Sequence, residues 1–418
     1  MINLRKEVIN PYMLVWKMNN YSITYVIFEI LMRMMSIMAF PVIYLFLLTI
    51  KPFKKIKFCF IYNRRFGHLL LNTDLFLRNK QLGFIPDNVY YLFFSYKPVN
   101  NQVVKMFQRN MNIINNEFFY KLFAPFGFFR TRFNEPLPLL SNEYYEYNKA
   151  DTSLFFTDEE CAVGRGELRK MGIGENDWYV CIFARDEIYT NTKFGGIDHS
   201  STDHRNGDID SYIDAVKYII DKGGFVIRMG YKVSKKFGYK NPKFIDYAIK
   251  YRSDFMDIYL TANCYFFIGT CAGGSDAARV FDKPHAAVNW MPIGSAPFGK
   301  NEIFISKKVV NKDSKLPVPF EKQINVLGDI LVQFGSSPED ILQENNMELE
   351  NNTPEEILEL TKEMFDRLNK NFTSDSEYER KLKQFNAILV DSNHWCSNFK
   401  QTPGKEFLMK MELHNTEN

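Results

Sequence analysis

The chain has 418 residues, 46% of them hydrophobic and 16% aromatic, which is enough for two domains with sizeable cores. Its 52 Lys and Arg nearly balance 49 Asp and Glu, so the net charge of +3 gives no argument for a nucleic-acid partner. The six cysteines form no CxxC pair and no zinc-like spacing, so reduced thiols are expected rather than a disulfide framework.

Residues 1–54 form a predicted hydrophobic, membrane-associated segment. Met34–Ile50 holds seventeen uncharged residues, which as a helix reach roughly 25 Å, slightly less than a bilayer core of about 30 Å. Pro41 lies in its middle and predicts a kink. Lysines follow at positions 51, 54, 55 and 57. Because positive flanks stay on the cytoplasmic side, we expect the catalytic part of the chain at the cytoplasmic face of the inner membrane.

Three arrangements of this segment fit the sequence. The sequence favours a single membrane span. A re-entrant or interfacial helix, kinked at Pro41, fits nearly as well and leaves both of its flanks on the inner leaflet. The third arrangement is a buried helix pair in a soluble domain, in which Glu29 and Arg33 pair at i,i+4.

Residues 55–150 are predicted to form a first Rossmann-like domain. Ile56–Tyr62 is an apolar run typical of a buried strand, and the loop 63–68 leads from it into a predicted helix, Leu69–Arg78. Val89–Ser95 follows as the next predicted strand. Residues 122–133 are aromatic and contain Pro and Gly, and they favour no single element.

Residues 151–345 are predicted to form a second Rossmann-like domain. A helix is expected over Thr157–Met171, with a capping box formed by Thr157 and Glu160 and a stop at Gly172. Further strands and helices alternate as Trp178–Ala184, Asp208–Asp221, Phe225–Met229, Asp257–Asn263, Cys264–Ile268 and His285–Asn289. This alternation predicts an α/β fold with two facing domains, each built on a parallel sheet. Residues 346–418 are expected to be a helical tail whose first helix is capped by Thr353 and Glu356.

The segment Cys264–Trp290 carries the strongest functional signal. An apolar strand ends at Gly269, the loop Thr270–Ser275 contains Gly273 and Gly274, and a short helix and a second strand follow. Such a loop brings backbone N–H groups onto an anion at a helix N-terminus. The sequence therefore predicts a bound phosphate or diphosphate.

Charged residues at neighbouring strand ends strengthen this prediction. Arg185 and Asp186 follow one predicted strand, at the edge where open α/β sheets place their ligands. Arg228 interrupts the apolar run of the next strand, where a charge is costly unless it is paired or faces a site. For both arginines a structural ion pair is the alternative.

The polar insert after Asp186 offers a weaker signal. His199, Asp203 and His204 could be combined into a metal site, but this spacing in a loop is a poor indicator, and no metal is expected. Asp208 and Asp210 match the D-x-D pattern of metal-dependent sugar transferases, yet Asp208 is better explained as the N-cap of the helix that it precedes.

In the first domain, Arg65, Gly67 and His68 occupy the loop after the first strand. His68 could act as a base near neutral pH, although a single loop histidine is more often structural. Asp74, farther along the helix, is a weaker candidate for the base.

Four stretches carry a resemblance to a known family. They read RRFGHLLLNTDLFLR, CIFARDEIY, DHRNGDIDSYIDAVKYIIDKGGFVIRMG and CYFFIGTCAGGSDAARVFDKPHAAVNW. In this order they resemble a family of bacterial glycosyltransferases linked to surface polysaccharide biosynthesis, which look like GT-B enzymes. The loop and helix of the last stretch are also similar to the donor site of heptosyl- and fucosyl-type GT-B enzymes.

The resemblance implies a nucleotide-sugar donor as substrate and no other cofactor. Gly273, Gly274 and Ser275 would meet the diphosphate, with Arg185 and Arg228 neutralising its charge, and we add Thr270, His204 and Asn289 to this donor set. His68, Arg65 and Asp186 are the expected catalytic residues. The hydrophobic N-terminus suits a lipid-linked glycan acceptor at the membrane.

Two other functions remain open from the sequence. The same fold could carry another transfer onto glycans, such as pyruvyl or phosphoryl transfer. The chain could also be a membrane-tethered scaffold with a degenerate site.

Overall fold

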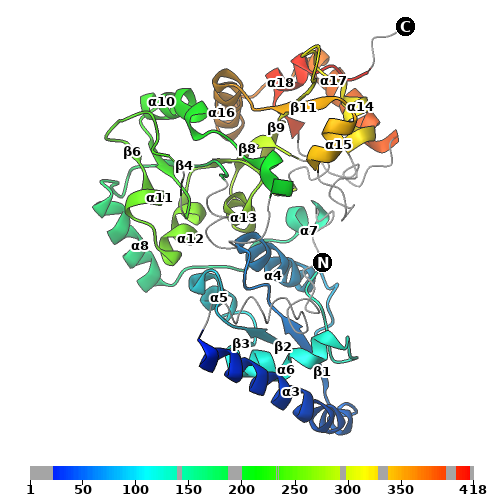
Figure 1. Ribbon diagram of the computed structural model, residues 1–418. Helices are drawn as coiled ribbons and strands as arrows, with labels where there is room; N and C mark the ends of the chain where they lie inside the picture. Colours follow the sequence, from blue (N-terminus) through cyan, green and yellow to red (C-terminus); the bar gives the residue numbers. More distant parts are fainter. Residues whose placement is uncertain are drawn as a thin grey trace. The chain divides into compact units, whose positions relative to one another are not determined.

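The computed structural model describes residues 22–138, 144–186, 200–231, 233, 235–291, 298–327, 338–391 and 402–414 (Figure 1). These residues divide into two compact units. Unit 1 comprises the described residues up to 138 together with Ser153–Phe155, and unit 2 comprises residues 144–152 and those from Phe156 onward. Each unit is an α/β structure with a parallel sheet, as predicted.

Unit 1 is built on a three-stranded parallel sheet in the order β1-β2-β3. Its strands are β1 (Lys55–Phe60), β2 (Val89–Ser95) and β3 (Ile113–Asn115), joined by α4 (Phe66–Gln81) and α5 (Asn101–Phe107). The ring of Phe76 on α4 packs edge-on against Phe93, with centroids 4.9 Å apart. The opposite face of the sheet, which carries Phe58 and Phe94, packs against α6 (Glu117–Phe128).

The apolar N-terminal region forms one helix, α3 (Ile23–Ile50), which contains Pro41. It is the only helix in the described part of the chain that is long and apolar enough to cross a membrane. Leu47 belongs to the same aromatic core as Phe58 and Phe94, so α3 is a layer of unit 1. The predicted boundary between residues 54 and 55 therefore does not separate two units.

Unit 2 is built on a seven-stranded sheet in the order β12-β9-β8-β7-β4-β5-β6, in which every neighbouring pair is parallel. The strands are β4 (Tyr179–Phe183), β5 (Phe225–Arg228), β6 (Phe244–Ile245), β7 (Phe267–Gly269), β8 (His285–Trp290), β9 (Glu302–Ser306) and β12 (Thr402–Pro403). Its central strands are buried on both faces, which explains why they read as continuous apolar runs.

Helices cover both faces of this sheet (Figure 1). One face packs against α10 (Ile213–Asp221) and α16 (Pro354–Leu368), and the other against α8 (Asp158–Lys170), α11 (Tyr247–Lys250), α12 (Asp254–Asn263) and α13 (Gly273–Val280). The two predicted capping boxes are confirmed: Thr157 with Glu160 begins α8, and Thr353 with Glu356 begins α16. Gly172 follows α8 with a φ of +85°, as its predicted role as a stop requires.

The region from residue 346 onward is part of unit 2 and is not a separate helical tail. Ile357 and Leu360 of α16 pack in the core beneath the large sheet, and β12 adds to its edge beside β9. The remaining elements are α7 (Tyr144–Lys149), β10 (Lys308–Asn311) paired antiparallel with β11 (Met347–Glu350), α14 (Phe320–Leu327), α15 (Pro338–Glu344), α17 (Ser376–Asp391) and α18 (Lys405–Lys410).

Candidate functional site

The candidate site lies where the strand order of unit 2 reverses. From β4 the chain continues to β5 and β6 on one side, and then returns to place β7, β8 and β9 on the other side of β4. Open α/β sheets bind their ligands at the carboxyl ends of the two strands that flank this reversal. Here these strands are β4, which is followed by Arg185, and β7, which is followed by Thr270.

Hydrogen bonds hold the ends of β4 and β7 together. The Arg185 N–H donates to Thr270 Oγ1 at 3.0 Å, and the Thr270 N–H donates to the Phe183 carbonyl at 3.2 Å. Ser275 Oγ donates to the Thr270 carbonyl at 2.7 Å. Thr270 and Ser275 are both fully buried. Their hydroxyls therefore shape the loop, and their predicted contact with a donor stays a prediction.

The first turn of α13 lies directly against β4. A Cβ placed on Gly274 would lie 3.2 Å from the ring of Phe183, a contact tighter than most side chains make. The N–H groups of Ser275 and Asp276 bond to the Ala272 carbonyl. In the described part of the chain no such bond engages the N–H of Gly273 or Gly274. These two groups are the donors that α13 can offer to an anion.

Two buried cations meet beside this turn. Arg185 Nη1 donates to Asn206 Oδ1, and Lys307 Nζ donates to the Asn206 carbonyl at 2.7 Å. Arg185 is 9% exposed and Lys307 is 6% exposed. Arg185 Nη1 lies 3.9 Å from Asp203 Oδ1, and no ion pair joins Lys307 to a carboxylate among the residues described.

The pKa values of both cations reflect this arrangement. Burial and the neighbouring Arg185 lower the pKa of Lys307 to about 8. Burial and the charge of Arg205 lower the pKa of Arg185 to about 10, so its guanidinium stays protonated at neutral pH. Because buried like charges oppose each other, a bound anion between them would stabilise both.

Asn289 adds a polar group at the end of β8. It is fully buried with a φ of +49°, and its Oδ1 accepts the Asn352 N–H at 2.6 Å. Its Nδ2 has no hydrogen-bond partner among the residues that the structure describes. The Nδ2 group lies near Gly207, where a Cβ would come within 3.3 Å of it. Gly207 belongs to the polar insert, and its N–H donates to the Arg185 carbonyl at 3.0 Å. Asn289 therefore lies beside the insert, close to the backbone of Arg185.

A buried ionic network joins α13 to strands β8 and β9. Glu302 of β9 accepts from Arg279 Nε at 3.1 Å and from the Gly299 N–H at 2.7 Å, and it lies 3.1 Å from His285 Nδ1. Arg279 also pairs with Asp276 at 3.0 Å. Burial opposes the charge on Glu302, but Arg279 and His285 outweigh it and hold the pKa of Glu302 at about 2. This network positions the helix that carries Gly273 and Gly274.

The other predicted donor residues have partners within unit 2. Arg228 is buried and pairs with Asp246 at 3.3 Å, and its Nη1 donates to the Lys235 carbonyl at 2.8 Å. This is the structural alternative for Arg228, and its contact with a donor stays a prediction. The His204 N–H donates to Glu339 Oε1 at 3.2 Å. Asp186 is partly exposed and follows Arg185 at the same sheet edge.

The D-x-D pattern has a structural explanation. Asp208 accepts the Asp210 N–H as the cap of a short 3₁₀ helix, Ile209–Tyr212, which precedes α10. Both carboxylates also pair with Lys235, at 2.5 and 2.7 Å. Among the described residues no group of three His, Cys, Asp or Glu is placed to hold a metal ion. His199, considered above for such a group, lies outside the described residues.

The predicted catalytic residues of the first domain lie at the start of α4 in unit 1. Arg65 is the N-terminal flanking residue of α4, and His68 Nδ1 lies 3.0 Å from Asn72 Oδ1 in its first turns. Asp74 is fully buried and accepts from Arg78 Nε at 2.7 Å. That burial removes Asp74 from consideration as the base, whereas the roles of His68 and Arg65 stay predictions.

Lys307 and Asn206 are site residues that the sequence did not indicate. Lys307 follows the apolar strand β9, and a lysine directly after a buried strand was the available signal. The sheet order β9-β8-β7-β4 brings Lys307 and Arg185 to the same sheet edge, although they are far apart in the chain.

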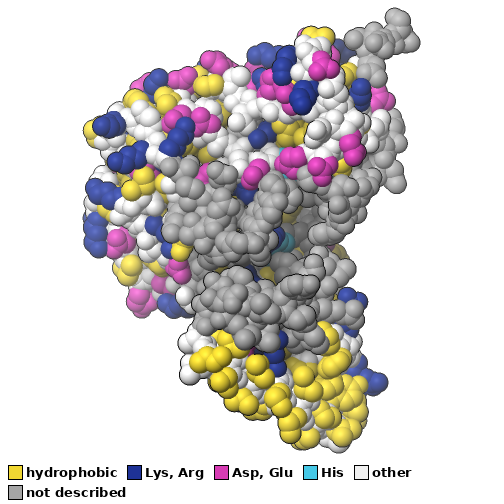
Figure 2. Space-filling model, viewed as in Figure 1, with side chains coloured by type: hydrophobic (Ala, Val, Ile, Leu, Met, Phe, Trp, Pro, Cys, Tyr) yellow, Lys and Arg dark blue, Asp and Glu magenta, His cyan; other side chains and the backbone are white. Residues whose placement is uncertain are grey.

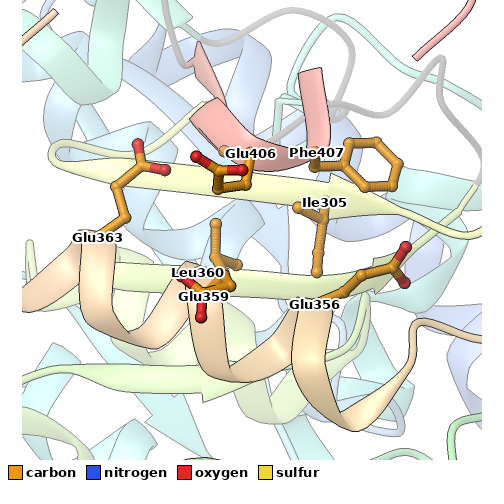
Figure 3. A pocket seen from close by; sticks show the side chains of 8 residues that line it. Ile305, Glu356, Glu359, Leu360, Glu363, Glu406 and Phe407 are labelled. Atoms are coloured by element: carbon orange, nitrogen blue, oxygen red, sulfur yellow. The ribbon is translucent and has the colours of Figure 1, made fainter. Parts of the chain in front are cut away.

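A small pocket elsewhere in unit 2 is not suited to a nucleotide (Figure 3). It lies between α16, β9 and α18, encloses about 20 Å³, and is lined by four glutamates, Glu356, Glu359, Glu363 and Glu406. In Figure 3, Glu363 and Glu356 lie on either side of Leu360 along α16. The volume is close to that of one water, and the carboxylates would repel a diphosphate.

Comparisons with known proteins identify distant structural likeness only. No protein-family profile and no curated protein match the chain. Among solved structures, it is similar to the ADP-heptose LPS heptosyltransferase II of Escherichia coli, with 10% identity, 60% of this chain and 90% of that chain covered, and a TM-score of 0.40. It is also similar to a glycosyl transferase family 9 protein of Veillonella parvula, with 12% identity, 60% of this chain and 86% of that chain covered, and a TM-score of 0.39. The E. coli heptosyltransferase WaaC, solved with ADP, has 10% identity, with 60% of this chain and 91% of that chain covered and a TM-score of 0.31.

Proposed function

We propose that the chain is a glycosyltransferase that moves a sugar from a nucleotide-sugar donor to a lipid-linked glycan in bacterial surface polysaccharide biosynthesis. One observation carries the proposal. Arg185 and Lys307 are buried cations that converge on Asn206 at the reversal of the strand order. Such a pair is expected to bind an anion, and the diphosphate of a nucleotide sugar is an anion that suits this position.

The chemistry of sugar transfer explains why these groups are needed. When the bond between the sugar and the diphosphate breaks, negative charge develops on the leaving diphosphate. Arg185 can donate two parallel hydrogen bonds to it, Lys307 supplies a point charge, and the N–H groups of Gly273 and Gly274 add helix N-terminal donors. These groups are held in place before the reaction. They therefore stabilise the extra negative charge of the leaving diphosphate in the transition state more than they stabilise the intact donor.

The remaining roles follow from the sequence resemblance. His68 or Asp186 deprotonates the acceptor hydroxyl, and Arg65 assists in unit 1. Arg228, His204, Thr270, Ser275 and Asn289 complete the donor set. Among them, the buried Asn289 Nδ2 has no hydrogen-bond partner in the described residues and can donate to the ligand. The two cations at the site, Arg185 and Lys307, supply the charge that a metal ion supplies in other transferases, so no cofactor beyond the donor is proposed.

The test is nucleotide release by the purified full-length protein. It is incubated with a panel of UDP-, GDP-, ADP- and CMP-sugars and lipid-linked acceptors, with and without EDTA, and free nucleotide is measured. We expect release from one class of donor, unaffected by EDTA, and a loss on the order of a hundredfold or more in Arg185→Ala. Arg169→Ala is the matched control, because Arg169 is an exposed arginine on α8 of the same unit.

The outcomes separate the alternatives. Release that EDTA abolishes and Mg²⁺ restores would contradict the metal-free part of the proposal. Absence of release from every donor, with nucleoside diphosphate still bound by the wild type and lost in Arg185→Ala, would favour a binding protein or scaffold. Absence of both binding and release would contradict the donor site and favour a different transfer, such as pyruvyl transfer.

A further inference from the structure

The outer face of α3 is apolar along its length. Six of its side chains, Leu31, Met34, Met38, Val42, Leu45 and Phe46, are each more than half exposed. A helix on the surface of a water-soluble domain carries polar residues at these positions. Figure 2 shows hydrophobic side chains gathered over this part of unit 1. Apolar patches of this extent in soluble proteins are usually covered by a partner or a membrane.

The inner face of α3 is fixed to unit 1 at both ends. In the C-terminal half of α3, Phe40 packs edge-on against Phe126 of α6 with centroids 4.9 Å apart, and Leu47 is buried in the core around Phe58. Near its N-terminal end, the buried carboxylate of Glu29 forms an ion pair with Lys121 of α6. A helix crossing the bilayer would have to leave these partners or draw α6 in with it. The packing therefore favours a helix that lies along the surface of unit 1.

The chain from the first turns of α3 into α4 has an excess of positive charge, and exposed lysines directly follow α3. Residues 30–73 contain seven Lys or Arg and no Asp or Glu. Lys51, Lys54 and Lys55 are exposed directly after α3, beside Phe53, which is 91% exposed. Each lysine near an anionic membrane surface contributes on the order of 1 kcal/mol of attraction. An exposed aromatic residue between lysines fits the boundary between headgroups and acyl chains.

We propose that the outer face of α3, together with Phe53, lies flat in one leaflet of an anionic bilayer, with α3 parallel to the membrane plane. The apolar side chains enter the boundary between headgroups and acyl chains by about 5–10 Å. Lys51, Lys54 and Lys55 bind anionic headgroups at the C-terminal end of α3. This inference replaces the single span that the sequence favoured, and it does not depend on the transferase proposal.

The experiment is co-sedimentation of the purified full-length protein with vesicles. Phosphatidylcholine vesicles are compared with vesicles that also contain phosphatidylglycerol, at low and high salt. We expect tighter binding to the anionic vesicles, weakened by salt. The double variant Met38→Glu with Val42→Glu should lower the partition coefficient at least tenfold on both kinds of vesicle. The triple variant Lys51→Gln, Lys54→Gln, Lys55→Gln should lower it on the anionic vesicles only.

Three controls make the result specific. Val163→Glu changes an exposed apolar residue on α8 of unit 2 and should leave vesicle binding unchanged. Circular dichroism and thermal unfolding of the double variant should match the wild type, because Met38 and Val42 lie on the exposed side of α3. Binding of a nucleoside diphosphate to unit 2 should also persist in the double variant, so failure of membrane binding is distinguishable from failure of the donor site.

A labelling experiment separates a flat helix from a span. Ser22→Cys and Pro52→Cys mark the two ends of α3, and an impermeant maleimide is added outside vesicles to which the protein has bound. If α3 lies flat, the maleimide reaches both introduced cysteines from outside, so each variant is labelled more than the wild type. Protection of one end alone would overturn the proposal in favour of a span. Equal binding of the wild type and the double variant to both kinds of vesicle would overturn it as well. So would a wild-type protein that is dimeric in solution while the double variant is monomeric, because the apolar face would then bind a second copy of the chain.

Discussion

At the scale of single residues, Lys307 is the group whose chemistry most sharply tests the site. Its pKa is lowered to about 8 by burial and by Arg185. It is therefore charged at neutral pH and loses its charge as the pH rises through about 8. Since a bound diphosphate favours the charged lysine, the free protein should show this titration and the donor complex should not.

We therefore expect kcat/KM for the donor to fall above about pH 8, while kcat at saturating donor holds to higher pH. Lys307→Arg keeps a cation that does not titrate in this range, so its kcat/KM profile should lose the fall. Lys307→Gln should lower kcat/KM by roughly tenfold to a hundredfold without that pH dependence. Pre-steady-state or initial-rate assays from pH 6 to 10 measure these profiles. A fall at pH 8 that persists unchanged in Lys307→Arg would assign the titration to another group.

At the scale of elements, α8 offers a matched pair of glycines. Gly164 is buried, and a Cβ there would overlap the ring of Tyr259 on α12. Gly166, two residues on, has nothing within 4 Å of such a Cβ. Gly164→Ala should therefore destabilise the fold by about 1–3 kcal/mol through overpacking. Gly166→Ala should stabilise it by about 0.5–1 kcal/mol, because alanine loses less backbone entropy in a helix.

Urea unfolding of both variants measures the two free energies of unfolding. Their opposite signs are the prediction, and each variant is the control for the other, because the two carry the same substitution on the same helix. Equal changes would mean that α8 does not pack on α12 through Gly164.

Some helices and strands have clear local sequence signals, and others do not. The capped helices α8 and α16 were predicted closely because the cap, the box and the stop lie within a few residues of one another. Strands β4, β5 and β8 were predicted because burial on both faces makes most of their residues apolar. By contrast, α6 contains Pro125 and Gly127, which obscure a helix that tertiary packing stabilises.

The candidate site was predictable only in part, for a related reason. Arg185 and the Thr270–Ser275 loop follow recognisable strands, so their meeting at one sheet edge could be expected. Lys307 reaches the site through the strand order of the whole sheet, which no local pattern encodes. The ion pair of Arg228 with Asp246 depends on β6 and the turn after it, and these two short segments carry no strong strand signal. The partner of α3 was hidden because an apolar helix reads alike whether its neighbour is lipid or protein.

At the scale of the whole molecule, the two units divide the proposed tasks. Unit 2 holds the donor groups at β4, β7 and β9, and unit 1 holds the apolar face of α3. Each binding event should therefore leave its own footprint on the chain. Hydrogen–deuterium exchange can record both footprints in one protein, because binding slows the exchange of backbone amides that it covers or stabilises.

A nucleoside diphosphate from the panel that supports release should slow exchange in the described residues around Arg185, in the first turn of α13 and after β9. Vesicles containing phosphatidylglycerol should instead slow exchange in α3 and in the residues just after it. Arg185→Ala should lose the first footprint and keep the second, and the double variant Met38→Glu with Val42→Glu should do the reverse. If the nucleotide protected only unit 1, the donor site would lie on the other unit, and the chemistry assigned to Arg185 and Lys307 would have to be given up. Because each variant removes one footprint and keeps the other, a general loss of folding cannot produce the expected pattern.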